Sequence, residues 1–110
     1  MNEPEVMQLD IHELKKRIDQ DPKLCLIDVR EQDEWNTGHI PGATHIPKDC
    51  LLEKIALAVP DKNQAIFLYC HGGTRSTLAA GWLHHVGYKE VYSVAGGIHS
   101  WESSGFPLII

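Results

Sequence analysis

Long apolar runs are absent from this chain of 110 residues. A membrane-spanning helix needs about 20 consecutive apolar residues, and the apolar stretch at 106–110 is far shorter. The first residues, Met-Asn-Glu-Pro-Glu, are acidic and polar, unlike the start of a secretory signal. The sequence therefore predicts a cytoplasmic protein that does not associate with membranes.

Cysteine is also scarce. Three cysteines, Cys25, Cys50 and Cys70, are widely spaced and form no Cys-x-x-Cys pair. An odd count at this spacing does not suggest a disulfide framework or a zinc site. Two histidines, His84 and His85, are adjacent, so on a helix their side chains would point about 100° apart. We expect no metal and no other cofactor.

Positive charge is in short supply as well. Ten Lys and Arg residues stand against fifteen Asp and Glu residues, which leaves a net charge of −5. Non-specific nucleic-acid binding needs clustered basic charge, so no nucleic-acid partner is expected. The hydrophobic content of 43% is ordinary for a globular protein, and this length suits one core. We expect a single domain over residues 1–110.

Short apolar runs alternate with helical patterns along the chain. The expected strands are 6–9, 24–29, 44–46, 65–69 and 91–94, and the expected helices are 11–19, 31–36, 50–59, 74–86 and 98–103. This alternation predicts an α/β fold with three α/β/α layers, in which helices cover both faces of a mostly parallel sheet.

Helical spacing also predicts which side chains face the core. Leu78, Trp82 and Val86 would form one inward stripe with Ala79 and Leu83 beside it. On the helix at 50–59 the inward residues would be Leu51, Leu52, Ile55 and Val59. Trp35, Trp82 and Trp101 are expected to be core anchors.

The stretch from residue 65 to 86 organises the chain. Its apolar strand stops at Cys70, and Gly72 and Gly73 then permit a tight turn before a helix starts at Thr74 or Arg75. Loop amides and the positive helix end would point at the sulfur. Such a setting lowers a thiol pKa from ~8.5 to roughly 3.5–7.5, which makes the thiol nucleophilic at neutral pH. The alternative is a small buried core residue.

The other two cysteines give weaker signals. Cys25 lies inside an apolar strand and is expected to be core. Cys50 lies near a helix start, and its sequence leaves open a reactive thiol or a partly buried one.

Three groups of motifs follow one another in a fixed order. Asp-Val-Arg at 28–30, Glu-Trp at 34–35 and Gly-His-Ile-Pro-Gly-Ala at 38–43 come first. Cys-His-Gly-Gly-Thr-Arg-Ser occupies 70–76, and Val-Ala-Gly-Gly-Ile at 94–98 precedes Trp101. Together they cover nearly the whole chain and resemble the rhodanese family of sulfurtransferases. The resemblance implies a single rhodanese-like domain whose sheet joins the five strands predicted above.

The resemblance also implies a reaction. Cys70 would take the outer sulfur of thiosulfate, a persulfide or a polysulfide and become a persulfide itself. The acceptor would be cyanide, glutathione or another small thiol, or a thioredoxin-like protein. The amides of the loop would form an anion nest, and Arg75 would hold an anionic donor. The residues expected to bind substrate are His71, Gly72, Gly73, Thr74, Arg75 and Ser76.

Several alternatives stay open. Many thiosulfate-using relatives carry Arg where this chain has His71, so thiosulfate capture is expected to be weaker. Only four residues separate Cys70 from Arg75, one fewer than in Cys-x5-Arg phosphatases, which disfavours a phosphatase or an arsenate reductase. A non-catalytic or sulfur-carrier module that docks to a partner protein is the second hypothesis.

The amino-terminal motif offers further polar residues with two possible roles. Asp28 and Arg30 either support the site or form an internal ion pair that braces strand ends. Glu34 and His39 are expected to fix the turn between Gly38 and Gly42 through hydrogen bonds.

Overall fold

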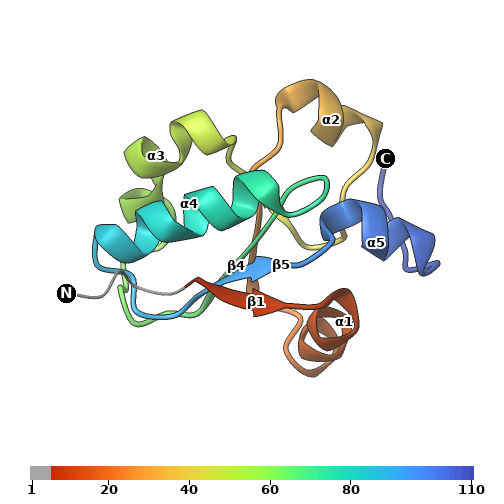
Figure 1. Cartoon of the computed structure of the whole chain (residues 1–110), viewed down its shortest axis with the longest axis horizontal. Helices are drawn as coiled ribbons and strands as arrows, with labels where there is room; N and C mark the ends of the chain where they lie inside the picture. The colour runs from red at the N-terminus through yellow and green to blue at the C-terminus, as the bar shows by residue number, and fades with distance from the viewer. Residues whose placement is uncertain (1–5) are drawn as a thin grey trace.

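The computed structural model describes residues 6–110, in which strands and helices alternate (Figure 1). The strands are β1 (Met7–Leu9), β2 (Cys25–Asp28), β3 (Thr44–His45), β4 (Ile66–Tyr69) and β5 (Val91–Val94). The helices are α1 (Ile11–Gln20), α2 (Gln32–Thr37), the 3-10 turn η1 (Lys48–Cys50), α3 (Leu51–Ala58), α4 (Thr74–His85) and α5 (Gly97–Ser103). Each expected strand and helix is present, with ends that coincide or differ by one residue.

The five strands form one sheet in the order β1-β5-β4-β2-β3, and every pairing is parallel. β4 therefore lies at the centre, with β2 and β5 beside it. The carboxyl ends of parallel strands meet at one edge of a sheet, which is where open α/β sheets bind ligands. In this register Asp28 of β2 lies beside Tyr69 of β4, the residue before Cys70.

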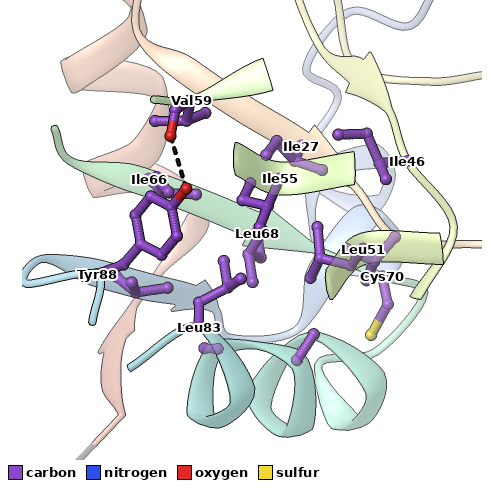
Figure 2. Close-up of a cluster of buried hydrophobic side chains, with 14 residues drawn as sticks. Ile27, Ile46, Leu51, Ile55, Val59, Ile66, Leu68, Cys70, Leu83 and Tyr88 are labelled. Atoms are coloured by element: carbon purple, nitrogen blue, oxygen red, sulfur yellow. Dashed lines mark hydrogen bonds between the residues drawn. The ribbon is translucent and has the colours of Figure 1, made fainter. Parts of the chain in front are cut away.

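Two apolar clusters fill the space between the sheet and its helices. α3 and α4 pack on one face, and α1 and α5 pack on the other (Figure 1). Figure 2 shows the first cluster, with Cys70 beside Leu51 at one end and Tyr88 at the other. The Tyr88 hydroxyl donates to the Val59 carbonyl at 2.6 Å, which satisfies its polar end inside the core. The predicted three-layer α/β/α fold is confirmed.

The turn into α4 shows why the sequence needs glycine there. Gly73 precedes the helix with φ of 113°, in the left-handed region that favours glycine. α1 starts after the parallel neighbour strand β1, and Asp10 caps it, because its carboxylate accepts the Glu13 amide at 2.8 Å.

The predicted inward stripe of α4 is wrong. Leu78 and Val86 are 51% and 40% exposed, whereas Ala79 and Leu83, predicted beside the stripe, are buried together with Ser76 and Ala80. The small side chains Ala79 and Ala80 allow the helix to approach the sheet closely, so the contact face is rotated from the bulky residues to the small ones.

Two further expectations about the core need correction. Leu52 is 48% exposed, because η1 sets the phase of α3 so that Leu51 and Ile55 face inward. Trp101 is buried as predicted, whereas Trp35 and Trp82 are only half-buried.

None of the helices found between residues 6 and 110 has the length and apolar character needed to cross a bilayer.

Candidate active site

Cys70 lies at the carboxyl end of the central strand, and its side chain is almost fully buried, with 1% of the residue exposed. The backbone amides of Gly73 and Ser76 donate to its sulfur at 3.1 and 3.4 Å. The Ser76 hydroxyl oxygen lies 3.6 Å from the same sulfur. The turn after β4 thus curls its donors around one sulfur atom.

Burial alone raises the pKa of the Cys70 thiol. The Ser76 hydroxyl and the amides of Ser76, Gly73 and Arg75 together outweigh burial, so the net pKa lies below that of an ordinary cysteine. This direction agrees with the expectation from the loop sequence. A thiolate held by preorganised amides is the form of cysteine that acts as a nucleophile.

The carbonyl groups of the loop are fixed by the first turn of α5. The amides of Ile98 and His99 donate to the carbonyls of Cys70 and His71, both at 3.0 Å. Gly97 makes this contact possible, since its φ is 56° and a Cβ there would collide with both carbonyl oxygens. With the carbonyls turned toward α5, the amides of the loop turn toward the sulfur.

A chain of buried hydroxyl groups lies beneath the loop. Ser93 of β5 and Ser76 are both fully buried, and their Oγ atoms are 2.7 Å apart. Ser93 Oγ also lies 3.0 Å from Thr77 Oγ1, which donates to the Gly73 carbonyl at 2.7 Å. Sequence reasoning missed Ser93, although a serine inside the apolar strand 91–94 is an available signal.

Glu34 reaches the loop from α2. Its carboxylate pairs with the Arg75 guanidinium through two hydrogen bonds, Nη1 to Oε1 at 2.6 Å and Nη2 to Oε2 at 2.9 Å. The hydrogen bond from Arg75 is the main reason that the pKa of Glu34 falls to about 2, and the same bond raises the pKa of Arg75. Glu34 also accepts the Glu31 amide at 2.9 Å, which completes a capping box at the start of α2.

The expected hydrogen bonds from the Glu34 side chain to the turn at 38–42 are not present, because its carboxylate binds Arg75 and the Glu31 amide. α2 packs beside the loop, and this brings together residues 41 positions apart in the sequence. His39 does belong to that turn: its ring stacks on Trp35 with centroids 3.5 Å apart, and its amide donates to the Ile109 carbonyl at 2.8 Å.

Asp28 and Arg30 form a buried ion pair at the end of β2. Nε of Arg30 lies 3.0 Å from both carboxylate oxygens of Asp28, and Nη2 lies 2.8 Å from Oδ2. Nη2 also donates to the Gly38 carbonyl at 2.6 Å. Of the two roles that the sequence left open, this geometry favours the internal pair, because it ties the strand end to the turn after α2.

Two hollows flank the loop. His71 is exposed and faces His99, with ring centroids 5.4 Å apart. Both line a cavity of about 160 Å³ together with Arg30, Gly38, Glu102 and Leu108. On the other side a groove of about 380 Å³ runs between Gly72, Gly73, Thr74 and the residues Ala95 and Gly96 before α5. Both give small molecules room beside the loop.

The two other thiols differ from Cys70. Cys25 and Cys50 are half-buried and pack against the same apolar cluster, and burial raises the pKa of the Cys25 thiol. Across residues 6–110, no group of three or more His, Cys, Asp and Glu side chains is placed to hold a metal ion.

Comparison with known proteins agrees with this arrangement. The model of the Rhodanese-like domain family matches residues 10–104. The "Putative sulfur carrier protein YrkF" of Bacillus subtilis is 35% identical over 100 residues, which make up 91% of this chain and 53% of that protein. The tRNA uridine(34) hydroxylase of Erwinia tasmaniensis is 38% identical over 82 residues, or 71% of this chain and 23% of that enzyme. The chain thus spans about half of one relative and a quarter of the other.

Solved structures show the same fold. A thiosulfate sulfurtransferase from Pseudomonas aeruginosa superposes with a TM-score of 0.86 at 27% identity, over 94% of this chain and 20% of that one. The polysulfide-sulfur transferase homodimer of Wolinella succinogenes gives a TM-score of 0.80 at 26% identity, over 94% of this chain and 78% of that one.

Proposed function

Because this chain belongs to the family of rhodanese-like domains, we propose that it is a sulfurtransferase that carries sulfane sulfur on Cys70. The observation that carries the proposal is the set of donors around the sulfur. The amides of Gly73 and Ser76 reach it at 3.1 and 3.4 Å, and the pKa of the thiol is lowered despite its burial.

Loading begins with the Cys70 thiolate. Its sulfur attacks the outer sulfur of the donor, a new S–S bond forms, and the S–S bond of the donor breaks. The leaving group departs with that electron pair, as sulfite from thiosulfate or as a thiolate from a persulfide. The amides of Gly73 and Ser76 then stand ready to stabilise negative charge on the persulfide.

Unloading is the same exchange with a second nucleophile. A thiolate or cyanide attacks the outer sulfur of the persulfide, and Cys70 leaves as the stabilised thiolate. No net oxidation of the protein occurs, so no cofactor is required. The hollow lined by His71 and His99 gives the acceptor access beside the loop.

The relatives support this reaction class and two kinds of donor. Thiosulfate and polysulfide sulfur appear in the names of two structural neighbours, and a sulfur carrier is named among the relatives by sequence. We propose thiosulfate, a persulfide or a polysulfide as the donor class and a small or protein thiol as the acceptor. The three free cysteines suit a reducing compartment such as the cytoplasm.

A second function is carriage of sulfur to a partner protein without turnover of small acceptors. The likeness to the Bacillus relative favours this alternative, since the chain matches half of that protein. Both functions use the Cys70 persulfide, and they differ in how readily cyanide or a small thiol removes the sulfur.

The test is the intact mass of the protein after incubation with a sulfur donor under non-reducing conditions. We expect the gain of one sulfur atom, its loss on adding cyanide, and no gain in Cys70→Ser. Cys25→Ser and Cys50→Ser are matched controls and should load like the wild type. Loading that persists in Cys70→Ser would overturn the assignment, and stable loading that cyanide does not reverse would favour the carrier.

A further inference from the structure

The active loop has a single full positive charge. Of residues 70–76 only Arg75 is a lysine or an arginine. In the structure both terminal nitrogens of its guanidinium are bound by the two carboxylate oxygens of Glu34, at 2.6 and 2.9 Å. A fork-to-fork pair of this kind fixes the guanidinium geometrically as well as electrostatically.

The pair is only partly withdrawn from solvent, with side chains 31% and 29% exposed. It therefore lies at the solvent-facing rim of the loop, near enough to Cys70 for the charge of the sulfur to raise the pKa of Arg75. The charges of Glu34 and Arg75 sum to zero, and the Nη atoms of Arg75 that would bind an anionic donor already bind Glu34. An anion that approaches Arg75 also approaches the Glu34 carboxylate.

The neighbouring cation offers no substitute. Arg30 lines the hollow beside His71, but its guanidinium is buried against Asp28, which is itself fully buried. Glu102 lines the same hollow and adds a carboxylate. Among the described residues around the loop, each arginine faces an acidic partner.

From this charge arrangement we propose that Glu34 is a specificity-determining residue. By holding Arg75 in a neutral pair, it disfavours dianionic sulfur donors such as thiosulfate relative to donors with one charge or none. Organic persulfides and thiosulfonate anions belong to the favoured class. The inference rests on the proposed function, because it concerns which donor loads Cys70.

The loading step is the same for both classes. With a thiosulfonate R–SO2–S⁻, the Cys70 thiolate attacks the outer sulfur and the S–S bond of the donor breaks. The sulfinate R–SO2⁻ leaves with the electron pair, as sulfite leaves from thiosulfate. Both donors break the same kind of S–S bond. A difference between their loading rates therefore reflects mainly the difference in charge between their leaving groups.

Two small donors make a matched pair. Methanethiosulfonate carries one negative charge, and thiosulfate carries two, with an oxygen in place of the methyl group. The rate at which each loads Cys70 is measured by intact mass in the wild type, Glu34→Gln and Asp33→Asn. Gln keeps an oxygen for the Glu31 amide at the start of α2. Asp33 is an exposed neighbour on α2, so its variant removes an equal charge from the same helix.

We expect Glu34→Gln to raise the thiosulfate rate on the order of tenfold at low ionic strength, because a dianion feels a unit charge nearby twice as strongly as a monoanion. The methanethiosulfonate rate should rise by about threefold, so the ratio of the two rates shifts toward thiosulfate. Asp33→Asn should leave this ratio near the wild-type value. An unchanged or lower ratio in Glu34→Gln would overturn the inference.

The wild-type protein supplies a second measurement that needs no variant. Because the Glu34–Arg75 pair is neutral, the net charge of −5 leaves the protein weakly repulsive to thiosulfate. Salt screens this repulsion, so added salt should leave the rate at which thiosulfate loads Cys70 unchanged or raise it. A rate that falls steeply with salt would reveal an uncompensated positive site and refute the role of Glu34. If neither donor loads Cys70 in any variant, the proposed function itself fails. Loading without a charge preference refutes only the inference.

Discussion

Asp28→Asn should destabilise the domain severely while sparing its chemistry. The Asp28 carboxylate is fully buried and accepts hydrogen bonds from Arg30 at four donor–acceptor distances between 2.8 and 3.0 Å. An asparagine presents an amide group where one carboxylate oxygen stood, and it leaves the buried guanidinium without a counter-charge.

The magnitude follows from that burial. Loss of one partner from a buried ion pair costs about 3–5 kcal/mol, because the remaining charge stays desolvated. Domains of this size have a total unfolding free energy of only about 5–15 kcal/mol. A loss of 3 kcal/mol lowers the melting temperature of such a domain by on the order of 12 °C or more.

Urea unfolding followed by tryptophan fluorescence and a thermal scan would measure the effect. Asp19→Asn is the matched control, since Asp19 is 60% exposed and pairs with Lys15 on the surface of α1. Such a pair contributes less than about 1 kcal/mol. A loss below 1 kcal/mol in Asp28→Asn would refute the reasoning about the buried pair. A strongly reduced rate of Cys70 loading in the folded variant would show instead that the pair tunes the site.

Three further predictions concern the loop and its supports. Gly97→Ala should displace the Cys70 carbonyl, because the added Cβ collides with it. The variant should therefore alkylate at Cys70 about tenfold or more slowly than the wild type at neutral pH. An alkylation rate equal to that of the wild type would show that the α5 contact does not orient the loop. Ser76→Ala should raise the pKa of Cys70, since the hydroxyl helps to lower it, and shift the pH–rate profile of iodoacetamide alkylation upward; an unmoved profile contradicts this role. Glu34 should make the free energy of unfolding depend on pH, because Arg75 lowers the pKa of Glu34 from 4.5 to about 2 in the folded protein. The ionised carboxylate should add about 1–2 kcal/mol to the free energy of unfolding. This contribution is complete above about pH 4.5 and is lost as the pH falls toward 2. Unfolding free energies of wild type and Glu34→Gln that stay parallel through that window would count against the pair.

Much of the fold follows from the sequence because local signals agree with one another. The alternation of short apolar runs with capped helical segments predicts the parallel sheet, and the strand at 91–94 is predicted to the residue. Cys70 at the end of the central strand follows from the same pattern. These features depend on residues that are close together in the sequence, so local sequence patterns predict them.

The predictions that the structure corrected, and the contacts that the sequence did not reveal, share a different cause. The inward face of α4 depends on how closely the helix approaches the sheet, and Ala79 and Ala80 decide this through their small size rather than their hydrophobicity. The partner of Arg75 lies 41 residues away on α2, and no local pattern links the two. Ser93 likewise meets Ser76 only because β5 pairs with β4 and α4, which follows β4, packs against β5. Such contacts come from tertiary packing, which the sequence pattern does not encode position by position.

The loop therefore owes its chemistry to supports outside it. α5 fixes the direction of its carbonyls through Ile98 and His99, α2 sets its net charge through Glu34, and β5 places the Ser93 hydroxyl beneath Ser76. Each support controls a different property, namely amide direction, charge at the rim and hydroxyl orientation. A relative could keep all of residues 70–76 and still differ in donor preference or thiol reactivity, because those properties change when a support changes. The loop motif alone thus points to the proposed reaction class, whereas we expect its three supports to decide which donor it uses and how fast.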